Sequence, residues 1–251
     1  MRRSHGRDEM ELLDANQPAN PMQSLQAYRS PRRRAQWAMA LIALIAIASL
    51  ILVVFRISER NLLVDLSTGN ISTNSLRLAQ ESDQRIASIS TVLFVLNLLT
   101  VIPFLMWFNR SYRNLLAFGA TGLRYGQSPN WAWISFFIPL LNIIRPFQTA
   151  QEMWTHTQST LSSQMPDRDS IVLRWWASYM AMNLLGQITV RAWRDFESFD
   201  DIFNANGLSL ASDIAVIIAS VLAIVFLRRL TERQEMKYQE MTKATAPAES
   251  V

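Results

Sequence analysis

The stretch SPNWAWISFFIPLLNIIRPFQ, Ser128–Gln148, decides how many times this chain crosses a membrane. Its apolar middle, Trp131–Ile144, is only 14 residues long and contains Pro139, whereas a spanning helix needs about 20 apolar residues. Proline lacks an amide hydrogen and disfavours helix at the preceding residue, so one straight helix is not expected. Two interpretations stay open: a re-entrant hairpin over residues 131–144, packed against spanning helices, or an interfacial helix kinked by the proline.

Long uncharged runs lie on both sides of this stretch. The chain is 50% apolar and 18% charged, which is typical of a multi-span membrane protein. Two of the later runs contain one charge each, Arg174 and Asp213, at positions that can reach an interface. The sequence therefore predicts an all-α integral membrane protein with four transmembrane helices, the short Pro-broken segment, and an amphipathic surface helix at 147–162. The four predicted spans cover about 36–55, 86–108, 171–190 and 208–228.

The distribution of Lys and Arg favours four crossings over five. If the stretch 128–148 does not cross the membrane, the 24 basic residues divide 18 to 6 between the two sides, with the larger share beside both termini. If it crosses, they divide evenly. Because Lys and Arg accumulate on the cytoplasmic side, both termini are predicted to be cytoplasmic, in the cell inner (plasma) membrane. This placement accounts for the +4 net charge without a nucleic-acid partner.

Polar segments at both ends complete the domain organisation. Residues 1–34 are predicted to form a disordered basic cytoplasmic tail, residues 35–230 the membrane domain, and residues 231–251 a second cytoplasmic tail. The chain has no cysteine, so it offers neither a disulfide nor a thiol nucleophile.

Charged, aromatic and amide residues lie within and on both sides of the stretch 128–148. Arg110, Arg113 and Asn114 come together where the second span leaves the membrane, which indicates either anchoring to anionic lipid headgroups or a specific binding site. Gly119 and Gly122 are predicted to end that helix. The motif and candidate binding residues are Arg110, Tyr112, Arg113, Asn114, Trp131, Pro139, Asn142, Arg145, Pro146, Glu152 and Trp154.

In their order these residues resemble the bacterial membrane family known as domain of unknown function 4328. The similarity is close over about 85–154 and covers the later spans in general layout. It rests on Arg110-Ser-Tyr112-Arg113-Asn114, Ser128-Pro129, Trp131-Ala132, Phe137-Ile138-Pro139, Asn142, Arg145-Pro146 and Glu152-Met-Trp154. The resemblance implies a multi-span bacterial inner-membrane protein without an assigned activity.

The last two predicted spans each have a regular face with a spacing of four residues. On the third span this face is polar and indicates either hydrogen bonding between helices or a polar pathway. It consists of Tyr179, Asn183, Gln187 and Arg191. On the fourth span the face is small and predicts a close packing seam, either inside the bundle or between the protomers of a homo-oligomer. It consists of Ala211, Ala215, Ala219 and Ala223.

Catalytic patterns are scarce, and no cofactor or metal is predicted. Glu152 and His156 form at most half of a metal site and are expected to be structural, and the common metalloprotease, phosphate-loop and nucleophile motifs are missing from the sequence. The leading hypothesis is a non-enzymatic scaffold, sensor or partner-binding module, with the lipid bilayer as its surroundings. The alternative is a small channel or transporter that uses the broken segment and the polar face. A lipid-modifying enzyme dependent on Glu152, His156 or Asp213 ranks third.

Overall fold

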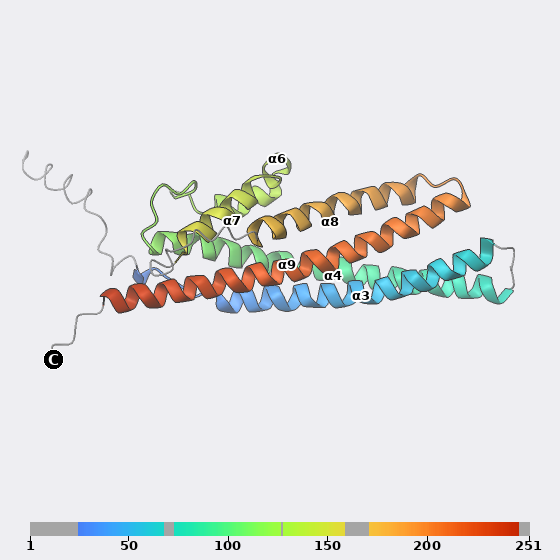
Figure 1. The fold of residues 1–251 in the computed structure, drawn as a ribbon, viewed down its shortest axis with the longest axis horizontal. Coiled ribbons are helices and arrows are strands. Elements are labelled where there is room, and N and C mark those ends of the chain that lie inside the picture. Colours follow the sequence, from blue (N-terminus) through green and yellow to red (C-terminus); the bar gives the residue numbers. More distant parts are fainter. Residues whose placement is uncertain (1–24, 68–72, 127, 159–170, 246–251) are drawn as a thin grey trace, which may run out of the picture.

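The computed structural model describes residues 25–67, 73–126, 128–158 and 171–245, and the secondary structure within these ranges is helical. Long helices run along the longest axis of the molecule, and short ones connect the second to the third (Figure 1). The long helices are α3 (Arg32–Ser67), α4 (Thr73–Ala117), α8 (Ile171–Arg194) and α9 (Phe199–Thr245). The short ones are α5 (Trp131–Ile134), the 3-10 helix η1 (Ser135–Phe137), α6 (Pro139–Asn142) and α7 (Arg145–His156).

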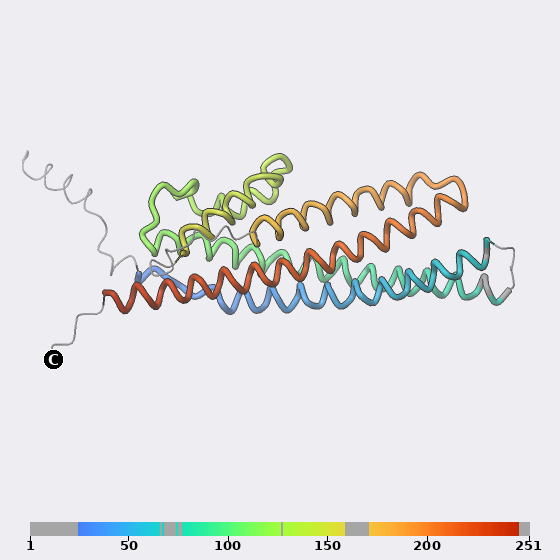
Figure 2. The backbone as a smooth tube through the Cα atoms, in the orientation of Figure 1, coloured from blue at the N-terminus to red at the C-terminus, as the bar shows by residue number. Residues whose placement is uncertain are grey.

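The long helices pack in the order α4, α3, α9, α8. α3 lies along both α4 and α9, and α8 lies along α9, whereas α4 and α8 have no comparable contact. α3 begins and α9 finishes at one end of the molecule, called here the terminal end; the α3–α4 and α8–α9 connections lie at the other, the hairpin end (Figure 2). At the terminal end α4 also reaches α9 directly, where the indole of Trp107 donates a hydrogen bond of 3.0 Å to the Thr231 hydroxyl.

Among the described helices, three are long and apolar enough to cross a membrane, so the molecule has the helices of a membrane protein. They cover Arg32–Asp65, Arg77–Ala117 and Phe199–Thr245 and contain the predicted spans 36–55, 86–108 and 208–228. The predicted span 171–190 coincides with α8, whose 24 residues are about 36 Å long. α8 is nevertheless not among the helices apolar enough to cross a membrane on composition alone, because Arg174, Asn183 and Gln187 interrupt its apolar residues.

Three of the described helices, α3, α4 and α9, extend well beyond their predicted spans. The edge of a membrane changes the polarity that a helix requires but not the preference of the chain for helix, so a helix continues where the flanking residues still favour it. Ion pairs one turn apart support these extensions: Glu81 lies 3.6 Å from Arg85 and 3.7 Å from Arg77 on α4, and Arg228 lies 2.8 Å from Glu232 on α9. The predicted tail at 231–251 accordingly continues as part of α9 to Thr245.

The predicted disordered tail at 1–34 is wrong for its last residues. Leu25 and Tyr28 are buried, and the Tyr28 ring stacks on Tyr238 of α9 at 4.2 Å and on Phe118 at 5.5 Å between centroids. The aromatic ring therefore holds this segment against the terminal end of the bundle, which the polar composition of the tail did not indicate. Residues 1–24 lie outside the described ranges.

The helical backbone of the stretch 128–148 is broken next to Pro139, as this proline predicts. Ile138 is extended, with φ −99° and ψ 112°, and Pro139 starts the next short helix. Phe136 packs edge-on against Phe104 and Phe108 of α4, and the indole of Trp176 on α8 donates to the Ile143 carbonyl at 3.1 Å. The broken segment, residues 131–144, is thus attached to both helices near the terminal end.

The helix predicted at 147–162 is observed as α7 from Arg145 to His156, and residues 159–170 lie outside the described ranges. Its buried face includes Ala150, Met153 and Trp154 and packs against protein. α4 ends at Ala117. Gly119, which was predicted to end this helix, follows with φ +71°. Its amide and that of Ala120 donate to the carbonyls of Leu116 and Leu115, the pair of bonds that closes many helix C-termini.

Candidate functional site

At the terminal end, several predicted motif residues meet in one buried hydrogen-bond network. Tyr112 and Asn114 on α4 are fully buried. The Tyr112 hydroxyl donates to Glu152 Oε2 at 3.0 Å and accepts from the Tyr125 amide at 2.9 Å. Glu152 Oε1 accepts from the Arg124 amide at 3.3 Å and lies 3.6 Å from the Arg124 guanidinium. The network fixes α7 and the loop after α4 to one turn of α4.

Asn114 extends this network toward α9 and the N-terminal segment. Its Nδ2 donates to the Arg29 carbonyl and to Gln234 Oε1, both at 3.1 Å. Gln234 is fully buried, and its Nε2 donates to the Ser111 carbonyl at 2.9 Å. Since each of these buried amides is shared between segments distant in sequence, the role of Asn114 in this structure is to join them.

The two predicted arginines of this region hold neighbouring segments. Arg110 donates to the carbonyls of Ala27 at 2.6 Å and Arg29 at 3.2 Å, and Arg113 donates to Asn130 Oδ1 at 2.8 Å. Arg113 and Asn130 are exposed. Both cations therefore stay close to the surface while they order the chain around them.

The remaining motif residues are spread over the broken segment and α7. Trp131 is exposed, and Pro139 occupies the first turn of α6. Asn142 Oδ1 is buried without a hydrogen-bond partner in the described part of the chain. Arg145 and Pro146 start α7, and Trp154 is buried beneath the Arg233 guanidinium, 4.0 Å from its ring centroid. These residues do not converge on the Tyr112 network as one site.

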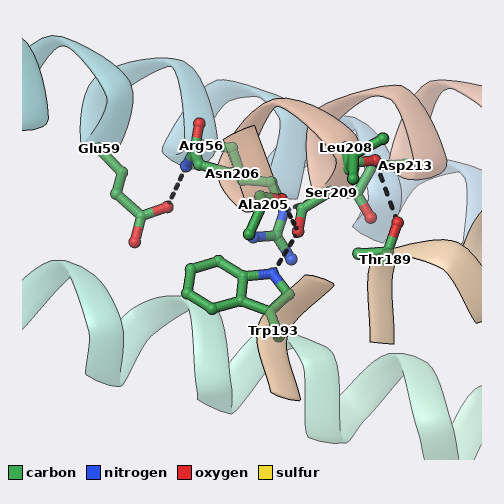
Figure 3. Close-up of polar contacts among 9 residues, drawn as sticks. All are labelled: Arg56, Glu59, Thr189, Trp193, Ala205, Asn206, Leu208, Ser209 and Asp213. Atoms are coloured by element: carbon green, nitrogen blue, oxygen red, sulfur yellow. Dashed lines mark hydrogen bonds and ion pairs between the residues drawn. The ribbon is translucent and has the colours of Figure 1, made fainter. Parts of the chain in front are cut away.

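A second polar cluster lies toward the hairpin end, where α3 meets α9 (Figure 3). Arg56 Nε lies 2.6 Å from Asp213 Oδ2, and the two side chains are only 13% and 12% exposed. One turn further along α3 and two turns away on α9, Asn206 Nδ2 donates to Glu59 Oε2 at 2.5 Å. The paired residues fix the register of α3 against α9.

The same cluster connects α8 to α9. The Trp193 indole donates to the Ser209 hydroxyl at 2.7 Å, and the Thr189 hydroxyl donates to the Leu208 carbonyl at 3.3 Å (Figure 3). None of these pairings was predicted from the sequence. The sequence did contain one indication of the Arg56–Asp213 pair. Arg56 directly follows one apolar run and Asp213 lies near the start of another, and a charge in such a position needs a partner.

A groove of about 410 Å³ separates α4 from α8, with α9 and α3 forming its floor and η1 its terminal end. Asn97 and Thr100 line it from α4, and Tyr179 and Asn183 from α8. The predicted polar face thus divides, because Gln187 and Arg191 are exposed and do not line the groove.

The predicted alanine seam also divides along its length. Ala219 is buried, Ala223 packs against the core, and both line the groove. Ala215 is half-buried and Ala211 is exposed. The part of the seam nearer the terminal end therefore serves packing within the bundle.

Glu152 and His156 do not form a shared site. Glu152 is engaged by Tyr112 and Arg124, and the His156 backbone carbonyl accepts from Lys237 Nζ. The residues that the structure describes contain no group of three His, Cys, Asp or Glu side chains placed to hold a metal ion.

Removing the Tyr112 hydroxyl tests the buried network. Tyr112→Phe should lower the free energy of unfolding by about 1–3 kcal/mol, because it leaves Glu152 Oε2 and the amide of Tyr125, both half-buried, without the Tyr112 hydroxyl as their partner. Tyr125→Phe is the matched control, since no hydrogen bond of the Tyr125 hydroxyl is recorded among the described residues. Unfolding in mixed micelles, followed by tryptophan fluorescence, measures both. Equal losses for the two variants would contradict the assignment.

Breaking the Arg56–Asp213 pair tests the second cluster. Arg56→Met should destabilise the protein by about 3–5 kcal/mol because it leaves Asp213 buried and unpaired. Arg56→Met combined with Asp213→Leu should recover most of that loss, and Arg228→Met, at an exposed pair on α9, should leave stability nearly unchanged. The same micelle titration measures all three. A double variant that loses as much stability as Arg56→Met alone would overturn the claim that the two charges depend on each other.

Comparison with known proteins identifies the family of this chain. The family model described as "Domain of unknown function (DUF4328)" matches residues 72–232, which include α4, all of the short helices, α8 and most of α9. No curated protein and no solved structure matches the chain. Because the family model covers well over half of its length, this chain belongs to the DUF4328 family.

Proposed function

We propose that the protein is a four-span inner (plasma) membrane protein with cytoplasmic termini, in which α8 crosses the membrane together with α3, α4 and α9. The main support is the pairing of α8 with α9 along its length. The rings of Trp175 and Phe226 stack at 4.5 Å near one end, and Trp193 bonds to Ser209 near the other. A helix attached in this way to a spanning partner lies at the same depth as that partner.

The depths of the charged residues agree with this topology. The pairing places Arg174 level with Arg228 and places Arg191 within about one turn of Asp213. Arg56 of α3 meets Asp213 at this second level. The charges of α8 and α9 thus lie at two levels about 25 Å apart, with no charged residue of either helix between the levels. This separation is close to the thickness of a bilayer core. The terminal end, which has more arginine, is then cytoplasmic.

The broken segment is proposed to enter only the cytoplasmic leaflet. Phe137 and Leu140 are 61% and 81% exposed, which favours contact with lipid tails. Trp131, at the start of the segment, suits the headgroup level. Exposed arginines at the terminal end, including Arg32 and Arg33 of α3, would bind anionic headgroups.

The proposed role is that of a non-enzymatic scaffold, sensor or partner-binding module. The carboxylates considered for catalysis already have partners: Glu152 binds Tyr112 and Arg124, and Asp213 binds Arg56. A homo-oligomer formed through the exposed end of the alanine seam, at Ala211, remains part of this proposal.

A small channel or transporter is the second candidate, supported by the amide and hydroxyl groups in the α4–α8 groove. It predicts flux of an ion or solute in reconstituted vesicles that is lost in Asn183→Leu or Asn142→Leu. Absence of flux over a broad panel of solutes would leave only the binding role.

Cysteine labelling tests the topology, because the chain has no native cysteine. Single cysteines replace Ser128, Gln158 and Asn204 and are treated with a membrane-impermeant maleimide in intact cells and in inverted vesicles. The proposal expects Ser128→Cys and Gln158→Cys to react only from the cytoplasmic side and Asn204→Cys only from outside. Reaction of Gln158→Cys and Asn204→Cys from one side would show that α8 does not cross.

A further inference from the structure

The α4–α8 groove holds its polar groups at one depth of the bundle. On α4, Asn97 lies ten residues before Trp107, which bonds to Thr231 of α9. A helix rises about 1.5 Å per residue, so Asn97 lies about 15 Å deeper than that contact. The α8–α9 pairing brings Tyr179 and Asn183 to the same level, beside Ser220 on the groove floor. This level is near the middle of the apolar layer, where lipid tails offer no hydrogen bonds.

These groups keep hydrogen-bonding capacity unused. Asn97 Nδ2 donates to the Leu93 carbonyl and Asn183 Nδ2 to the Tyr179 carbonyl, each at 2.8 Å within its own helix. A carboxamide carries a second N–H and an accepting oxygen. Both asparagines are exposed in the bundle. Each can therefore donate to a molecule in the groove without giving up its present bond.

The volume of the groove matches that of a small-molecule site. The groove extends on α9 from Val216 to the level at which Phe226 meets Trp175, a depth of about 15 Å. The groove holds about 410 Å³, a volume typical of a small-molecule site.

The lining defines the chemistry of an occupant. No charged side chain lines the groove, which favours a neutral molecule. Aromatic rings surround it on several sides and suit a flat ring. They belong to Phe94, Phe104, Phe136, Phe137, Trp175 and Tyr179.

We propose that the α4–α8 groove binds a flat, uncharged lipid that carries carbonyl acceptors, the chemistry of a membrane quinone. Its ring packs among the aromatic side chains, and its carbonyl oxygens accept from Asn97, Asn183 and the Tyr179 hydroxyl. The hydrocarbon tail leaves sideways between α4 and α8 into the bilayer. This site deepens the proposed binding function and rests on α8 being a span.

Binding of 2-decyl-1,4-benzoquinone to the full-length protein in phosphatidylcholine nanodiscs tests the site. The dissociation constant is obtained from the rise in unfolding temperature with ligand concentration. Decylbenzene, which has the ring and chain without the carbonyls, is the matched ligand and should bind at least tenfold more weakly. Asn97→Leu and Asn183→Leu should each weaken quinone binding about tenfold, the effect of one lost hydrogen bond. Gln187→Leu removes an amide one turn away, outside the groove, and should leave binding unchanged.

Equal binding of the two ligands, or binding unaffected by both asparagine variants, would overturn the proposal, as would absence of quinone binding. Circular dichroism and the unfolding temperature without ligand identify any variant that fails to fold. Cysteine labelling in the same nanodisc lipid, reconstituted as vesicles, separates the two proposals. Opposite labelling of Gln158→Cys and Asn204→Cys without quinone binding overturns the ligand alone, whereas labelling from one side overturns the topology and the site together.

Discussion

The contact between α3 and α9 positions the other long helices. α4 packs mainly on α3, and α8 packs on α9, so the relation of these outer helices to each other follows from the register of the central pair. Arg56 and Asp213 set that register at 2.6 Å, supported by Glu59 one turn away on α3 and Asn206 two turns away on α9. Charged groups buried at the edge of an apolar layer tolerate few alternative pairings. The pair accordingly contributes more to a unique arrangement than to net stability.

This arrangement leaves α4 and α8 apart, and the open side between them is the groove. The short helices close only its terminal end, where Phe136 and Phe137 reach the lining. The same region carries the buried network of Tyr112, Asn114 and Glu152. One end of the bundle is thus held rigidly by hydrogen bonds, while the middle of the groove faces outward. The family match begins after α3, at residue 72, so the helix that separates α4 from α9 lies outside it.

The sequence predicted those features that depend on local chemistry. Three of the predicted apolar spans lie in the three helices that are long and apolar enough to cross a membrane. The backbone is extended at Ile138, directly before Pro139, and Gly119 follows the end of α4 with a positive φ. Helix ends outside the apolar layer could not be read from hydropathy, because residues such as Glu81 and Arg85 favour helix in water as well. The docking of Tyr28 on Tyr238 depends on residues 210 positions apart, which no local pattern encodes.

The motif residues were predicted as a binding site, and the structure instead gives many of them structural partners. Tyr112 and Asn114 belong to hydrogen bonds inside the bundle, while the groove draws on Asn97 and Thr100, which the sequence did not single out as site residues. Half of the polar face, Tyr179 and Asn183, does reach the groove. The spacing of four placed these residues on one face of α8, but only tertiary packing decides which part of that face a neighbour leaves open.

Disulfide formation between α3 and α9 in native membranes tests the register of these two helices. The in-register pair is Glu59→Cys with Asn206→Cys, whose native side chains meet at 2.5 Å. The off-register pair is Glu59→Cys with Asp213→Cys, two helical turns away along α9. With no native cysteine in the chain, mild copper-catalysed oxidation followed by peptide mass spectrometry reports each bond without background. We expect rapid intramolecular cross-linking of the in-register pair and little of the off-register pair. Equal yields, or faster cross-linking of the off-register pair, would contradict the register on which the whole bundle depends.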